Sequence, residues 1–101
     1  MMNQQEKVRE FIEKHELDST PEFRILDLVS EVGEIAKDAT KSTDYGANPE
    51  DISVKEDEIG DVLFSILAVA ESLDIDSDKA LDTALDKYRE RIGEKGDPGS
   101  K

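Results

Sequence analysis

Apolar residues recur at helical spacing in several segments of this chain, and no segment alternates over a confident length as a half-buried strand does. The first predicted helix spans about residues 3–16, with a narrow stripe of Val8, Phe11, Ile12 and His15. The last spans about residues 78–92, and its stripe consists of Leu81, Ala84, Leu85, Tyr88 and Ile92. The pattern predicts an all-α fold.

A second helix is expected over about residues 21–41. Pro21 suits a first helical turn, and Ser19 with Glu22 has the spacing of a capping box. One broad apolar face is predicted to pack on the core: Ile25, Leu28, Val29, Val32, Ile35, Ala36 and Ala39.

The third helix, about residues 53–73, is expected to be the most buried element. Ser53 and Glu56 offer a capping box at its start, and from Val62 to Ala70 only Ser65 is polar. A surface helix of a four-helix monomer would not be apolar nearly all round. We therefore expect a four-helix bundle completed by homo-oligomerisation, as a homodimer or homotetramer.

Length and composition indicate one helical domain, residues 1–93, followed by a flexible tail at residues 94–101 that is rich in glycine. Among 101 residues, 26 are acidic and 13 basic, which gives a net charge of -13. Such a charge repels a bare phosphate backbone and makes duplex nucleic acid or an anionic membrane an unfavourable partner. Acidic residues spread along the whole chain are also typical of a protein kept soluble in high salt.

The sequence contains no cysteine, which excludes disulfides and thiolate metal sites. Its first residues lack the apolar run of a signal peptide, and the stretch from Val62 to Ala70 is too short to span a bilayer. We expect a soluble protein of the cytoplasm.

Two pairs of carboxylates stand out because they are embedded in apolar sequence. Glu31 with Glu34, and Glu58 with Asp61, are each three residues apart and so share one side of a helix. If the two helices pack face to face, the four carboxylates would surround a hard divalent cation, and oxygen ligands favour Mg²⁺ or Mn²⁺. The alternative is a solvated acidic face in an acidic protein.

A basic pair lies on the last helix. Lys87 and Arg91 are one turn apart, which suits them to bind phosphate oxygens. The alternative is stabilisation of the helix C-terminus by cations. Because the pair points away from the apolar stripe of its own helix, it would reach a site only across a helix edge or a subunit interface.

Together these features resemble the MazG-type all-α nucleoside triphosphate pyrophosphohydrolases. Glu31-x-x-Glu34 and Glu58-x-x-Asp61 match that family's E-x-x-E and E-x-x-D motifs, and the flanking residues are similar to those of the family. The last helix carries the family's Lys-aromatic-x-x-Arg run. The resemblance covers about residues 26–92. One departure is Ser30, where many members have an additional acid.

The resemblance implies hydrolysis of a (d)NTP between its α- and β-phosphates, giving monophosphate and pyrophosphate, in a role of nucleotide-pool housecleaning. It implies that Glu31, Glu34, Glu58 and Asp61 hold Mg²⁺, with Glu34 also positioning or activating water. Lys87 and Arg91 would bind the phosphates, in sites near subunit interfaces. Two alternatives stay open: a non-catalytic acidic oligomerisation module, and a degenerate relative that binds nucleotide without turnover. His15 is interpreted as structural; Tyr45 and Phe64 are weaker candidates for base stacking.

Overall fold

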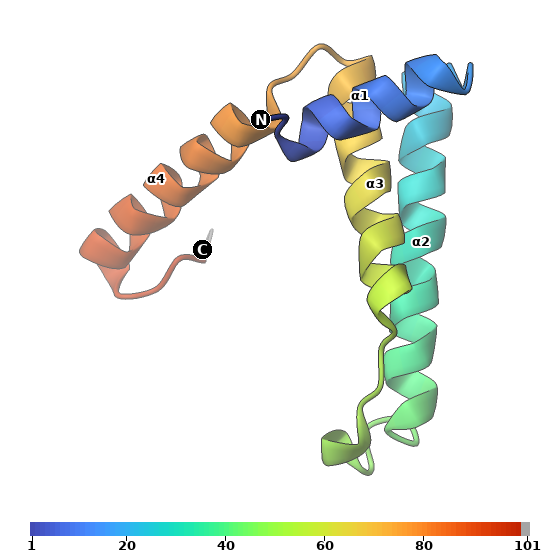
Figure 1. Cartoon of the computed structure of the whole chain (residues 1–101). Helices are drawn as coiled ribbons and strands as arrows, with labels where there is room; N and C mark the ends of the chain where they lie inside the picture. The colour runs from blue at the N-terminus through green and yellow to red at the C-terminus, as the bar shows by residue number, and fades with distance from the viewer. Residues whose placement is uncertain (100–101) are drawn as a thin grey trace.

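The structure, a computed structural model, describes residues 1–99. Helices form the whole of its regular structure in this range, without any strand (Figure 1), so the predicted all-α fold is confirmed. The elements are α1 (Gln4–Lys14), α2 (Pro21–Ser42), the 3₁₀ turn η1 (Pro49–Asp51), α3 (Glu56–Ser72) and α4 (Ser77–Lys95).

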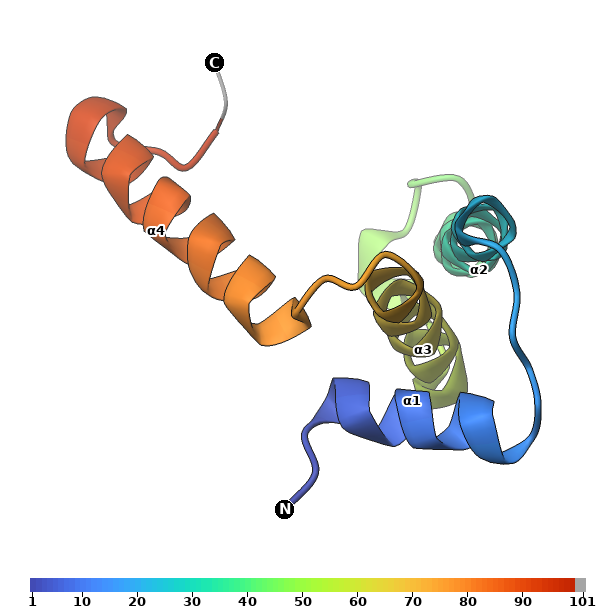
Figure 2. The ribbon, with the colours of Figure 1, turned by 90° about the horizontal axis from the view of Figure 1, so that it is seen from above.

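Helix α3 is the centre of the fold. Both α2 and α1 pack against it, α2 side by side and antiparallel and α1 across it (Figures 1 and 2). The small core joins Val8 and Ile12 of α1 to Leu67 and Ala68 of α3. Phe64 lies against this core, and the Phe11 ring meets the Phe64 ring edge-on with centroids 6.0 Å apart.

His15 contacts an aromatic ring, not a polar group. Its ring centroid lies 4.5 Å from that of Phe11, at the end of α1. This packing agrees with the structural role expected for the chain's single histidine.

Helix α2 begins at Pro21 as predicted, but two of the predicted capping residues are wrong, by one residue for α2 and by two for α3. Thr20, not Ser19, caps α2, because its hydroxyl accepts from the amide of Phe23. Helix α3 begins after Lys55, not at Ser53, and the carboxylate of Glu58 accepts from the Lys55 amide. Each of these oxygens lies three residues from the amide it binds, so sequence spacing alone did not decide between neighbouring caps.

Helix α4 starts where expected but runs in an unexpected direction. Asp76 caps it through the amides of Asp78 and Lys79. The helix continues past the predicted end at Ile92 to Lys95, and Gly96 ends it in a left-handed conformation (φ 82°). It projects away from α2 and α3 instead of lying along them (Figure 2). Of the predicted tail, residues 100–101 lie outside the described range.

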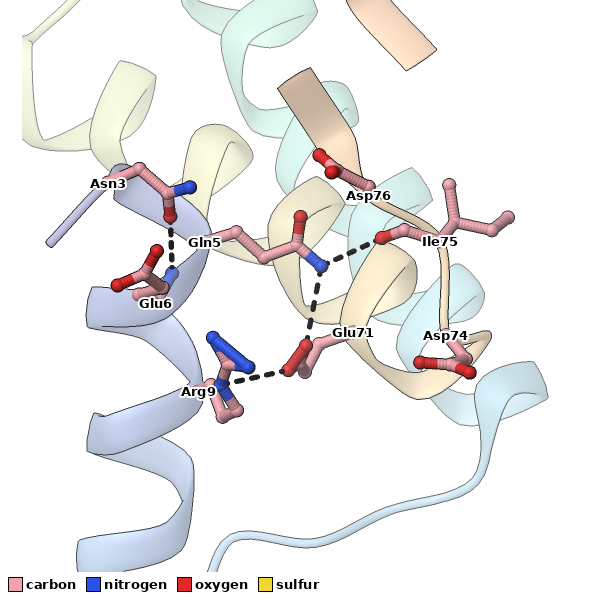
Figure 3. A pocket seen from close by; sticks show the side chains of 8 residues that line it. All are labelled: Asn3, Gln5, Glu6, Arg9, Glu71, Asp74, Ile75 and Asp76. Atoms are coloured by element: carbon pink, nitrogen blue, oxygen red, sulfur yellow. Dashed lines mark hydrogen bonds and ion pairs between the residues drawn. The ribbon is translucent and has the colours of Figure 1, made fainter. Parts of the chain in front are cut away.

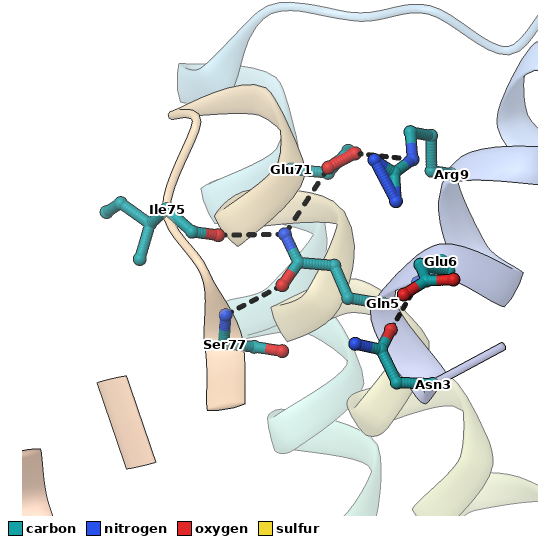
Figure 4. Close-up of polar contacts among 7 residues, drawn as sticks. All are labelled: Asn3, Gln5, Glu6, Arg9, Glu71, Ile75 and Ser77. Atoms are coloured by element: carbon teal, nitrogen blue, oxygen red, sulfur yellow. Dashed lines mark hydrogen bonds and ion pairs between the residues drawn. The ribbon is translucent and has the colours of Figure 1, made fainter. Parts of the chain in front are cut away.

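A polar network fixes the start of α4 against α1. The Gln5 amide group donates to the carbonyl of Ile75 at 2.8 Å and accepts from the amide of Ser77 at 2.7 Å (Figure 4). Gln5 also donates to Glu71 at 3.3 Å, and Arg9 pairs with the same carboxylate at 3.5 Å. These side chains line a polar pocket between α1, the end of α3 and the connection to α4 (Figure 3).

Much apolar surface is left uncovered by this arrangement. The broad face predicted for α2 is split: Leu28, Ile35 and Ala39 are half-buried, whereas Ile25, Val29 and Val32 are exposed. Exposed apolar residues also follow one face of α3 and the stripe of α4: Ile59, Leu63, Ile66, Leu81, Leu85, Tyr88 and Ile92. None of the helices within residues 1–99 combines the length and apolar character needed to cross a bilayer.

We predict that the Gln5 network stabilises the fold. Gln5→Ala removes hydrogen bonds to Ile75 and Ser77 and should lower the free energy of unfolding by about 1 kcal/mol in urea denaturation. Gln4→Ala is the matched control, because Gln4 is exposed on the same helical turn. Equal stabilities of the two variants would contradict this role.

Candidate functional site

The acidic residues of α2 and α3 meet along one flank of the packed pair. On α2, Asp27, Glu31, Glu34 and Asp38 follow one another at intervals of four, three and four residues, which keeps them on one side of the helix. On α3, Glu58 and Asp61 share a flank with Ser65 in the same way. We call this flank the acidic seam, defined by these seven residues.

A cavity of about 210 Å³ opens in the seam. It is lined from both helices by Arg24, Asp27, Glu31, Asp61, Phe64 and Ser65. One carboxylate of each sequence motif, Glu31 from the first and Asp61 from the second, therefore faces the same space. The packing of α2 on α3 has brought together residues that are far apart in the sequence.

Glu58, the first acid of the α3 motif, is engaged elsewhere. Its carboxylate accepts from the Lys55 amide at 3.0 Å, as the cap of α3. The pKa of Glu58 is raised above its usual value, chiefly because its side chain hydrogen-bonds to Asp38 and only partly offset by the Lys55 amide. Asp38 is thus close enough to Glu58 to favour the protonated form of that carboxyl, so Asp38 belongs to the site as much as Glu58 does.

Glu34 is exposed on α2. Within residues 1–99, no three His, Cys, Asp or Glu side chains come together in a group that could hold a metal ion. The structure thus forms two pairs, Glu31 with Asp61 and Asp38 with Glu58. Carboxylate oxygens are the metal ligands that Mg²⁺ and Mn²⁺ prefer, so these residues suit such a cation chemically.

The two predicted phosphate-binding cations do not lie at the seam. The Lys87 ammonium group sits 5.5 Å from the centroid of the Tyr88 ring, and Arg91 donates to the carbonyl of Pro98 at 3.2 Å. Both belong to α4, which points away from the seam-bearing helices (Figure 2). In one chain as folded here, Lys87 and Arg91 are not brought to Glu31 and Asp61.

Two of the residues that join the predicted acids here can be found from the sequence. Asp38 shares one face of α2 with Asp27, Glu31 and Glu34. Ser65 shares a face of α3 with Glu58 and Asp61, and its small side chain favours space for a ligand between the helices. Arg24 was not singled out, although it lies seven residues before Glu31 and so on the same face of α2. Its hydrogen bond to Leu17 depends on how α1 and α2 are connected.

The raised pKa of Glu58 predicts a pH effect in metal-free solution. At pH values between the usual and the raised pKa of Glu58, the folded chain binds more protons than the unfolded chain. Protonation of Glu58 therefore contributes to the free energy of unfolding at low pH, and this contribution is lost as pH rises through the raised pKa. Asp38→Asn should lower the pKa of Glu58, measured by ¹³C NMR of its carboxyl carbon. Asp44→Asn, at an exposed site, should not. An unchanged Glu58 pKa in Asp38→Asn would rule out Asp38 as the cause of the raised pKa.

Comparison with known proteins agrees with this arrangement. The chain is similar to the uncharacterized protein YpjD of Bacillus subtilis (strain 168), with 40% identity over 68 residues that cover 63% of this chain and 60% of that protein. The match thus spans less than two thirds of the relative's length. No solved structure matched significantly. The model of the MazG nucleotide pyrophosphohydrolase domain matches residues 19–94, a range that includes both acidic motifs and α4. The chain belongs to the MazG nucleotide pyrophosphohydrolase domain family.

Proposed function

We propose that this protein hydrolyses nucleoside triphosphates, of ribose or deoxyribose type, between the α- and β-phosphates to give a monophosphate and pyrophosphate. The observation that carries the proposal is the shared cavity of Glu31 and Asp61, one acid from each motif of the family. Removal of aberrant nucleotides from the cellular pool is the role that we assign to it.

The carboxylates would hold Mg²⁺, or Mn²⁺ in its place. Glu31 and Asp61 face the cavity already, and Glu34 and Glu58 lie one turn from them on the same helices. A divalent cation bound there offsets phosphate charge and makes bound water more acidic. For Glu58 to bind the cation, its hydrogen bond to Asp38 would have to break. A bound cation favours this change, because its positive charge stabilises the ionised form of both carboxyl groups.

Glu34 is the residue that we assign to the attacking water. Its carboxylate is exposed and has no hydrogen bond or ion pair within the described part of the chain, so it is available to orient a water molecule and accept its proton. The water oxygen would bond to the α-phosphorus as the bond from that phosphorus to the bridging oxygen breaks. Glu34 would take the proton of the water, and pyrophosphate would leave.

We further propose that the working form is a homodimer or homotetramer. Exposed apolar residues repeat at helical intervals on two helices: Ile59, Leu63 and Ile66 on α3, and Leu81, Leu85, Tyr88 and Ile92 on α4. Monomeric proteins rarely leave stripes of this kind uncovered. In such an assembly Lys87 and Arg91 would approach the phosphates from a second subunit.

We predict that Glu34→Gln abolishes turnover without unfolding the protein. Pyrophosphate and monophosphate release should be measured on a panel of canonical and modified (d)NTPs with Mg²⁺ or Mn²⁺, in low salt and in molar KCl. Loss of a general base should lower the rate about 10²-fold or more. Glu22→Gln, at an exposed position of α2 outside the seam, should keep wild-type activity.

Absence of release from folded wild-type protein across the whole panel in both salts would refute the enzymatic proposal. It would leave the two alternatives, a non-catalytic oligomerisation module or a degenerate nucleotide-binding relative. Binding of nucleotide without turnover would favour the second of these.

The oligomer predicts a difference between two faces of α4. Leu85→Glu places a charge in the apolar stripe and should shift the mass measured by light scattering toward that of the 11.3 kDa chain. Thr83→Glu lies on the opposite face of the same helix and should leave the assembly intact. A wild-type protein that is already monomeric would refute this part of the proposal.

A further inference from the structure

Arg24 and Ser65 line the cavity of the acidic seam although neither belongs to a recognised motif of the sequence. Both line the cavity that Glu31 and Asp61 share, and Arg24 is its only basic lining residue. We infer that Arg24 and Ser65 form the subsite that binds the pyrophosphate part of the substrate. The inference rests on the proposed function and names the residues that would make the enzyme selective for substrates with a polyphosphate.

Arg24 is anchored by a hydrogen bond to the connection between α1 and α2. It is half-buried at the second turn of α2, and its Nη2 donates to the carbonyl of Leu17 in the connection from α1. A guanidinium group has five N–H donors in a rigid fork, so one bond to Leu17 leaves several donors for a ligand. Within residues 1–99 Arg24 forms no ion pair, despite the carboxylates of Asp27 and Glu31 in the same cavity.

Ser65 supplies an independent sign of a ligand. Its side chain is 8% exposed among apolar neighbours of α3, and its hydroxyl has no hydrogen-bond partner in the described part of the structure. Ser65 lines the cavity, and among the described residues no fully buried side-chain oxygen lacks a partner, so this hydroxyl is open to the cavity. A serine hydroxyl there can donate a hydrogen bond to a phosphate oxygen.

The positions of the two residues along the helices suit an extended polyphosphate. Arg24 precedes Glu31 by two turns of α2, a rise of about 10 Å, and Ser65 follows Asp61 by one turn of α3, about 6 Å. Because α2 and α3 run antiparallel (Figure 1), both displacements point toward the same end of the seam, where α1 crosses. Phosphates that extend from the carboxylates toward α1 would therefore meet Ser65 and then Arg24.

The negative charge of the cavity is the reason that a polyphosphate subsite needs Arg24. The cavity is lined by three carboxylates, Asp27, Glu31 and Asp61, which repel a polyphosphate even when a divalent cation offsets part of their charge. Lys87 and Arg91 lie on α4, away from this part of the molecule (Figure 2). Within residues 1–99, Arg24 is thus the one cation that a single chain would place against the phosphates in this cavity.

The test is binding of Mg²⁺-pyrophosphate and of nucleoside monophosphate, measured by calorimetry on the full chain. Arg24→Gln should weaken pyrophosphate binding about tenfold or more, as loss of a charge-assisted hydrogen bond does, and should change monophosphate binding little. Ser65→Ala should weaken pyrophosphate binding severalfold. Arg89→Gln is the matched control, since Arg89 is exposed on α4 and pairs with Asp86.

Variants of Arg24 must be shown to fold, because the bond to Leu17 is lost in Arg24→Gln. Arg24→Lys keeps the charge and should retain part of the affinity, and Ser65→Ala leaves that bond intact. Pyrophosphate binding within twofold of wild type in both Arg24→Gln and Ser65→Ala would overturn the inference. So would wild-type protein that binds no pyrophosphate, or a loss of affinity confined to Lys87→Gln.

The two proposals fail in different ways. If wild-type protein binds pyrophosphate through Arg24 but releases none from any nucleotide, the hydrolytic function fails and the subsite stands. If wild-type protein hydrolyses nucleotides and Arg24→Gln has an unchanged KM and pyrophosphate affinity, the subsite fails and the function stands. A change of base preference in Arg24→Gln with unchanged pyrophosphate binding would instead place the nucleobase against Phe64 and overturn the assignment.

Discussion

The antiparallel packing of α2 against α3 is the contact on which the rest of this structure depends. It places carboxylates from two distant motifs along one seam, where like charges repel. The pKa of Glu58 is raised beside Asp38, which is the effect of that repulsion on one carboxyl of the seam. At the other end of the seam Arg24 offers a positive charge. The packing contact thus creates a site that favours cations and, once cations are present, phosphates.

The opposite side of the same helix pair is governed by the hydrophobic effect. Helix α3 uses one face for α1 and another for α2, and its third face exposes Ile59, Leu63 and Ile66. Helix α4, which would cover that face in a compact four-helix bundle, is held in another direction by the Gln5 network at its start. The apolar stripes of α3 and α4 therefore remain open to other surfaces. This division separates the chemistry of the seam from the surface that we assign to assembly.

Periodicity predicted which residues share a helix face but not what each face meets. It identified all four helices, the central position of α3 and the two acidic pairs, since these depend on residues three and four apart. It could not predict that Glu58 caps α3 through the Lys55 amide, because several nearby acids and hydroxyls compete for that place. Nor could it predict the direction of α4, which depends on Gln5 some seventy positions earlier in the chain. The hydrogen bond from Arg24 to Leu17 could not be predicted either, because it depends on the path of the connection from α1.

The central claim is that the seam of α2 and α3, not the acidic surface at large, binds the divalent cation. Addition of Mn²⁺ to ¹⁵N-labelled protein tests it most directly, because the ion broadens the amide signals closest to it. We predict that the signals around Glu31 and Asp61 broaden first, at substoichiometric Mn²⁺, and that Asp61→Asn removes this effect. Broadening spread evenly over the acidic residues, or centred on the acids at the start of α4, would contradict the account.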